Sequence, residues 1–289
     1  MPFPLSSLPY GFRQRLRELA TPVEAYQLQT AAPHFCGFEP LVQLNRPDDI
    51  REYQINGSVS DSQLIYYNGL EKQLIPLTGD SVYLGQRLEL HCLKNVNKVF
   101  NHCILSAYEI LEFSRMYIDL SLVQKINANL NVKTVYYNHD ERARPYLCFI
   151  SCYVDPEAHP VIYRTLFKHF QDISFFDFPN DSNWLQDMMN ENVSGLRNLS
   201  FSFRSLEVLN VDKALFKKFC LAQATDFKFD LRRVCIYSID RRFKQKFDHL
   251  TRGNFAAVQH LPLKSVRTVT FRESGSDGYN TTFELLSHS

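Results

Sequence analysis

The chain has 289 residues, 45% of them hydrophobic, and its 32 lysines and arginines nearly balance its 31 aspartates and glutamates. A chain of this length and composition can bury a substantial core without disulfides or metal ions. Because no charge of one sign dominates, neither nucleic acid nor an anionic membrane surface is an expected partner.

The N-terminal sequence lacks a basic segment followed by a continuous apolar run, and no stretch approaches the roughly 18 apolar residues of a membrane span. These features predict a cytoplasmic or nuclear protein. The seven cysteines are an odd number and lie among apolar neighbours. Reduced, mostly buried thiols are therefore expected.

A short helix is expected directly after Pro9, which favours the opening turn. Phe12, Leu16 and Leu19 follow at helical spacing and define one apolar face. The opposite face is strongly basic and is expected to be solvated.

A second helix is expected to begin at residues 21–24, with the sequence Thr-Pro-Val-Glu. This sequence is a capping box with proline in the first turn. The helix should end near Pro33. Three of its residues are expected to face the protein interior: Ala25, Leu28 and Ala32. Two helices of this length cannot hold a core alone, so they must pack on the rest of the chain or on a partner.

The sequence from residue 41 to residue 87 predicts a connecting β-rich segment. Strands are expected at residues 51–55 and 63–67, each followed by an Asn-Gly dipeptide that is typical of tight turns. A small antiparallel meander is the expected arrangement.

From about residue 88 a pattern recurs in which an apolar residue is followed three and then five positions later by two more. Six sets follow it: Tyr108/Leu111/Phe113, Val132/Val135/Tyr137, Phe170/Ile173/Phe175, Leu196/Leu199/Phe201, Leu231/Val234/Ile236 and Val266/Val269/Phe271. Helical stretches lie between several sets, for example at residues 122–130 and 214–221. Alternating strands and helices predict a parallel sheet with helices on one side.

The expected fold class is therefore α/β: a short N-terminal helical module followed by an irregular leucine-rich-repeat-like solenoid of alternating strands and helices. A doubly wound sheet with helices on both faces is the alternative. The predicted domains are a helical module at residues 1–40, the β-rich segment at 41–87 and a strand–helix repeat domain at 88–289. A hairpin of residues 266–271 and 281–286 should cap the last domain.

The sequence contains no glycine-rich phosphate loop and no Gly-x-Ser-x-Gly motif, so neither catalytic residues nor a cofactor are expected. Three fragments of metal-ligating residues lack the remaining ligands of a site and predict no metal: His102-Cys103, Cys148 with Cys152, and His139-Asp140-Glu141. Phe243 and Phe247, within the most basic segment, are expected on the buried face of a helix instead of stacking on bases.

The first 40 residues resemble an F-box. The resemblance rests on Leu8-Pro9, on Leu16 and Leu19 at the end of the first helix, and on residues 21–28, which open the second helix. The aromatic-rich strand–helix region behind it is similar to that of the large F-box families of nematodes. The resemblance implies that the helices dock on an adaptor protein of a cullin-based ubiquitin ligase while the repeat domain binds the target protein. The implied docking residues are Leu8, Pro9, Leu16, Leu19, Pro22 and Leu28.

The sequence thus predicts a protein–protein interaction subunit, an F-box substrate-recognition component of a ubiquitin ligase, and not an enzyme. One alternative is a non-catalytic repeat scaffold without a ubiquitin-ligase connection. Another is an enzyme of unrecognised type, which would need a concave pocket with convergent polar groups.

Overall fold

The computed structural model describes residues 7–45, 52–56, 63–68, 71–84, 87–105, 110–130, 145–176, 183–234, 241–258, 266–273 and 280–285. The chain divides into two compact units, Met1–Glu112 with Ala128–Ala143 and Phe113–Asn127 with Arg144–Ser289. The predicted boundaries after residues 40 and 87 both lie inside the first unit. None of the helices in the described ranges is long and apolar enough to cross a membrane.

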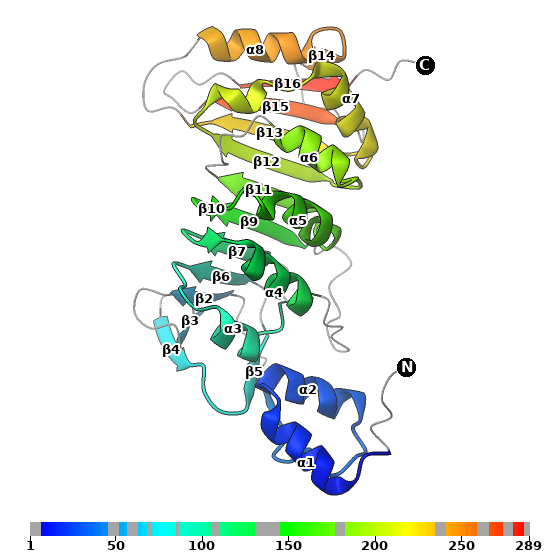
Figure 1. Ribbon diagram of the computed structural model, residues 1–289. Coiled ribbons are helices and arrows are strands. Elements are labelled where there is room, and N and C mark those ends of the chain that lie inside the picture. Colours follow the sequence, from blue (N-terminus) through cyan, green and yellow to red (C-terminus); the bar gives the residue numbers. More distant parts are fainter. Residues whose placement is uncertain are drawn as a thin grey trace. The chain divides into compact units, whose positions relative to one another are not determined.

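The first unit combines an N-terminal helix pair with short strands (Figure 1). Its elements are α1 (Tyr10–Leu19), α2 (Pro22–Ala31), β1 (Gln43–Asn45), β2 (Glu52–Asn56), β3 (Gln63–Asn68), β4 (Glu71–Pro76), β5 (Ser81–Tyr83), β6 (Arg87–His91) and α3 (Asn97–His102). Strands β2, β3 and β4 form an antiparallel meander, as predicted, and β2 also pairs in parallel with β6. Strand β1 pairs in parallel with β5. The glycines of both predicted turns lie outside the described residues.

Helix α2 is part of the core of the first unit. Its Val23, Ala25 and Tyr26 are buried in one cluster with four residues from the following chain: Val42, Val82, Leu84 and Ile104. Ala25, with no exposed surface, has no room for a larger side chain. The N-terminal helices are therefore integrated with the rest of the first unit through α2.

The second unit repeats strands and helices along the chain. Its elements are β8 (Tyr117–Ile118), α4 (Leu120–Leu130), β9 (Tyr146–Ile150), β10 (Tyr153–Val154), α5 (Ala158–Thr165), η3 (Leu166–Lys168), β11 (Asp172–Phe176), α6 (Trp184–Asn190), β12 (Asn198–Phe203), η4 (Leu206–Leu209), α7 (Lys213–Ala222), β13 (Lys228–Arg233), α8 (Arg241–Thr251), β14 (Phe255–Val258), β15 (Thr268–Glu273) and β16 (Asn280–Leu285). Two elements are shared between the units. Residues 110–112 of strand β7 (Ile110–Ser114) and residues 128–130 of α4 belong to the first unit, and the rest of each element belongs to the second.

The sheet of the second unit is mixed. Strands β9, β11, β12, β13 and β15 are parallel neighbours in chain order, and β16 and then β14 follow in antiparallel pairing. Since successive crossovers run in one direction along the sheet, the right-handed crossover rule places the connecting helices on one face. Figure 1 agrees, with α5, α6 and α7 drawn on the same side of these strands. The reversal of strand order that a doubly wound sheet needs does not occur in this run.

The core of the second unit is built on two rows of aligned side chains. One row contains Leu147, Ile173, Leu199, Phe229 and Val269, and the other contains Phe149, Phe175, Phe201, Leu231 and Phe271. The ring centroids of Phe149 and Phe175 are 4.9 Å apart, and those of Phe175 and Phe201 are 5.6 Å apart. Contacts of this kind add to the stability gained by burying the rings.

The predicted apolar triplets match these rows in part. The sets ending at Phe175, Phe201 and Phe271 coincide with β11, β12 and β15. The set at Leu231 was placed too late, because the inward pair of β13 is Phe229 and Leu231 while Val234 is exposed beyond the strand. The set at residues 132–137 lies outside the described residues, as do Tyr108 and Ile236, while Leu111 and Phe113 are buried in β7.

The predicted terminal hairpin is present as β15 and β16, which pair antiparallel. It does not end the sheet, because β14 pairs with the other side of β16. The prediction of an α/β fold is confirmed: the described residues contain eight α-helices and a large mixed sheet.

Candidate functional site

Helix α1 presents its apolar face to solvent. Phe12 and Leu19 are 66% and 69% exposed, and Leu16 is 36% exposed. The helix starts after Pro9, whose carbonyl accepts hydrogen bonds from the amides of Phe12 and Arg13 at 3.0 and 3.2 Å. The predicted apolar face is therefore present, and it is most open to solvent at Phe12 and Leu19.

The opposite face of α1 is less solvated than its arginines predicted. Arg17 is buried: its guanidinium donates to the carbonyl oxygen of Pro40 at 3.0 and 2.9 Å and pairs with the Asp80 carboxylate at 2.9 Å. A guanidinium can be buried when its donors are paired in this way. The prediction of a wholly solvated basic face is wrong at Arg17, whereas Arg15 is exposed.

The loop after α2 closes over this side of α1. The guanidinium of Arg13 lies 5.7 Å from the centre of the Phe35 ring. Gly37 has a φ of +97°, and a Cβ at this position would lie 3.2 Å from the Tyr10 ring. A side chain at Gly37 would therefore be strained by the backbone and would crowd α1.

The start of α2 has the predicted capping box. The Thr21 hydroxyl accepts from the Glu24 amide at 3.4 Å, and the Glu24 carboxylate accepts from the Thr21 amide at 2.8 Å. The helix ends at Ala31, before Pro33, as predicted. Ala25 and Ala32 are buried, and Leu28 is half-buried.

An apolar groove of about 480 Å³ lies between α1 and α2. It is lined by Leu16, Leu19, Ala20, Glu24, Gln27, Leu28 and Ala31. We call it the α1–α2 groove. Its lining offers a single carboxylate, already engaged in the capping box, and no imidazole, thiol or amine. Its chemistry therefore suits the binding of apolar side chains and not proton transfer.

The groove brings together three of the six predicted docking residues: Leu16, Leu19 and Leu28. Leu8 and Pro9 precede α1, and Pro22 is the first residue of α2, so these three lie at helix starts and outside the groove lining.

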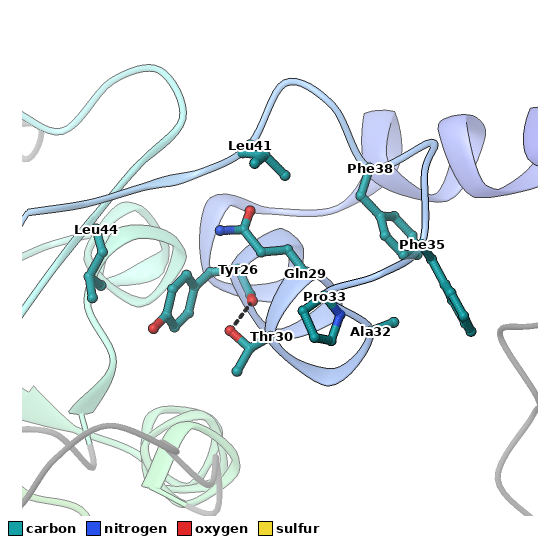
Figure 2. A pocket seen from close by; sticks show the side chains of 9 residues that line it. All are labelled: Tyr26, Gln29, Thr30, Ala32, Pro33, Phe35, Phe38, Leu41 and Leu44. Carbon is teal, nitrogen blue, oxygen red and sulfur yellow. Dashed lines mark hydrogen bonds between the residues drawn. The ribbon is translucent and has the colours of Figure 1, made fainter.

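A second hollow of about 390 Å³ lies on the side of α2 that faces the following loop (Figure 2). Tyr26, Pro33, Phe38 and Leu44 are among its lining residues, and the Thr30 hydroxyl donates to the Tyr26 carbonyl there at 2.8 Å.

One contact at this hollow was not predicted from the sequence. The Gln29 side chain forms two hydrogen bonds with the backbone of Val42, accepting from its amide at 2.9 Å and donating to its carbonyl at 3.2 Å. The only signal was a glutamine on the half-buried side of the helix, which does not identify its partner.

The residues weighed as metal ligands or thiols have other contacts. His102 Nδ1 lies 2.8 Å from the Ser81 carbonyl, and the Cys152 thiol donates to the Phe113 carbonyl at 3.1 Å. The six described cysteines are thiols that form no disulfide among the described residues, and burial raises the pKa of the Cys220 thiol, which keeps it protonated. No cluster of metal-ligating residues occurs in the described ranges, which do not include residues 139–141.

In the second unit, burial raises the pKa of Asp230, although its carboxylate lies 3.3 Å from the Arg272 guanidinium. Phe247 is fully buried, as predicted, while the side chain of Phe243 lies outside the described residues. A hollow of about 530 Å³ beside α7 is lined by residues that include Lys213, Lys217 and Lys218.

Comparison with known proteins gives limited similarity. No family model matches the chain, and no solved structure matches it. The chain is 29% identical over 96 residues to a Dictyostelium discoideum protein named "Putative actin-fragmin kinase". This similarity covers 28% of the chain and 23% of that protein, so the chain matches less than a quarter of the relative.

This similarity contradicts the prediction that the chain is not an enzyme. The prediction rested on missing glycine-rich and nucleophile motifs, which identify only some classes of active site. The relative is named as a kinase, and so links part of the chain to a protein with an ascribed catalytic activity.

Proposed function

We propose that the chain is a protein–protein interaction subunit that acts as an F-box substrate-recognition component of a cullin-based ubiquitin ligase. The observation that carries the proposal is the α1–α2 groove, where Leu16, Leu19 and Leu28 converge. An apolar surface on short helices is typical of a site that a partner covers.

In this proposal the second unit is an irregular leucine-rich-repeat-like solenoid that binds the target protein. Its parallel strands in chain order and its one-sided helices support this interpretation. Repeats of this kind expose one face of the sheet and the turns at the strand ends, which are surfaces suited to a protein partner.

The test is binding of the purified full chain to the ligase adaptor, measured by calorimetry. Leu16→Asp and Leu19→Asp should each weaken binding by at least tenfold, because either change places a charge in the groove. Phe12→Asp is the matched control: Phe12 is as exposed as Leu19 and lies on the same helix, but it is not part of the groove lining.

Single substitutions are preferable to deleting residues 1–39. Deletion would remove Val23, Ala25 and Tyr26 from the core cluster, and would confuse loss of docking with unfolding. If the full chain does not bind the adaptor, or if the three variants bind equally well, the ligase proposal is wrong. A scaffold role without a ligase connection would then take its place.

As a second candidate, we propose that the chain is part of a protein with kinase activity. The support is the similarity to the Dictyostelium protein so named, of which the chain spans 23%. Incubation of the full chain with radiolabelled ATP and a general protein substrate tests this function. ATP binding and label transfer would favour it, and the absence of both would exclude it for this chain.

A further inference from the structure

Two turns of the second unit repeat the same sequence pattern. Residues 113–119 read Phe-Ser-Arg-Met-Tyr-Ile-Asp, and residues 149–155 read Phe-Ile-Ser-Cys-Tyr-Val-Asp. The phenylalanines, tyrosines and aspartates occupy equivalent positions. In both turns a core strand ends and a short strand, β8 or β10, carries the tyrosine.

The backbone of the two turns is also equivalent. Arg115 and Ser151, two residues before each tyrosine, have φ angles of 51° and 49°, which are uncommon for residues other than glycine. The Arg115 amide donates to the Ile150 carbonyl at 2.8 Å, and the Tyr153 amide donates to the Met116 carbonyl at 2.9 Å. These bonds fix one turn against the next and limit the motion of the tyrosine backbone.

The turns present Tyr117 and Tyr153 as an exposed stacked pair. The ring centroids are 5.4 Å apart with an angle of 8° between the planes, and the two residues are 56% and 63% exposed. The Tyr117 hydroxyl donates to the Asp155 carboxylate at 3.0 Å, and this hydrogen bond raises the pKa of Tyr117. Two large aromatic rings are therefore held rigidly in contact with solvent.

The charge around the pair is negative. The segments 113–119 and 149–157 carry three carboxylates, Asp119, Asp155 and Glu157, against one guanidinium, Arg115, for a net charge of −2. Tyrosine faces attract cations, and arginine in particular stacks on them. The same carboxylates repel phosphates, which disfavours stacking of nucleic-acid bases at this position.

We propose that Tyr117 and Tyr153 form a docking site for an arginine-containing, positively charged segment of a partner protein. An arginine would stack on an exposed tyrosine ring while the neighbouring carboxylates attract the remaining positive charge. The inference deepens the proposed function, and rests on it in treating the second unit as the part that binds a target protein.

The experiment measures binding of the full chain to a fluorescent peptide of alternating arginine and serine, by fluorescence anisotropy. A peptide of alternating glutamate and serine is the control. The arginine peptide should bind, and Tyr153→Ala should weaken binding about fivefold. Tyr153→Phe, which keeps the ring, should bind like the unchanged protein, and Glu157→Gln should weaken binding about twofold by removing one charge.

Leu221→Ala provides a matched control, because Leu221 is an exposed apolar residue of α7 in the same unit. It should leave binding of the arginine peptide unchanged. The inference is overturned if the arginine peptide fails to bind, if Tyr117→Ala combined with Tyr153→Ala has no effect, or if the glutamate peptide binds equally well.

The peptide and adaptor experiments can fail independently. Peptide binding without adaptor binding would leave the tyrosine site intact and overturn the ligase proposal. Adaptor binding without peptide binding would support the ligase proposal and overturn the tyrosine site.

Discussion

Helices α1 and α2 are each ten residues long and follow one another in the chain, yet they use their apolar residues in opposite ways. Helix α2 buries Val23, Ala25 and Tyr26 in the core of the first unit. Helix α1 buries Arg17 and leaves Phe12 and Leu19 in solvent. One helix is held by apolar packing, and the other by a buried guanidinium.

The difference shows that apolar periodicity identifies a face without telling what covers it. On α2 the covering residues come from the same unit. On α1 the equivalent role is left to a molecule outside the chain, if the proposed docking is correct. The same charged substitution should therefore change the free energy of unfolding much more on α2 than on α1.

The largest effect is expected from Ala25→Asp. Ala25 has no exposed surface, so the carboxylate would be buried without a partner and would lower the free energy of unfolding by on the order of 4 kcal/mol. Leu19→Asp, at a side chain that is 69% exposed, should change it by less than about 0.5 kcal/mol. Urea denaturation followed by circular dichroism measures both.

The chain's one tryptophan, Trp184, is buried in the second unit, so its fluorescence follows that unit separately. A transition that shifts in circular dichroism but not in tryptophan fluorescence would locate the loss in the first unit. Equal stability of the two variants would contradict the contrast between the helices.

A smaller effect is expected from Arg17→Ala, which removes two hydrogen bonds to Pro40 and the ion pair with Asp80. The free energy of unfolding should fall by about 2 kcal/mol, since these bonds are charge-assisted and buried. Arg15→Ala is the control: Arg15 is exposed and pairs with Glu18 along the helix, so a change below about 0.5 kcal/mol is expected.

Arg17→Lys sharpens the result. A lysine keeps the positive charge but cannot reproduce the forked geometry, so it should recover only part of the lost stability. Full recovery would show that charge alone holds α1 in place. The measurement is again urea denaturation, compared at equal salt concentration.

Local chemistry made the start and end of α2 predictable. The capping box between Thr21 and Glu24 and the stop before Pro33 depend on neighbours within a few residues. The burial of Arg17 was not predictable, because its partners Pro40 and Asp80 are distant in the chain. The same limit applies to the Gln29 contact with Val42.

In the second unit, the period-two apolar pattern found β11, β12 and β15. It misplaced β13 because Leu231, Val234 and Ile236 also fit the recurring apolar spacing, although the strand ends at Arg233. The exposed pair of Tyr117 and Tyr153 was not predicted either. The repeated spacing from phenylalanine to tyrosine to aspartate was a usable signal, although exposure of the rings becomes evident only from the fold.

The smallest of the three expected losses of stability concerns the capping box. This box fixes the start of α2, which forms one side of the α1–α2 groove. Thr21→Ala removes the hydroxyl that accepts from the Glu24 amide and should lower the free energy of unfolding by about 1 kcal/mol.

Thr30→Ala is the same substitution within the same helix, but the Thr30 hydroxyl donates to the Tyr26 carbonyl, which is already an acceptor within the helix. Because alanine has the higher helix propensity, Thr30→Ala should cost less than Thr21→Ala. Hydrogen exchange of the α2 amides would separate a local opening at the cap from a loss of the whole unit. If both variants lose equal stability, the packing of the threonine side chains stabilises α2, and the cap does not. The position of this helix would then depend on packing at both of its ends.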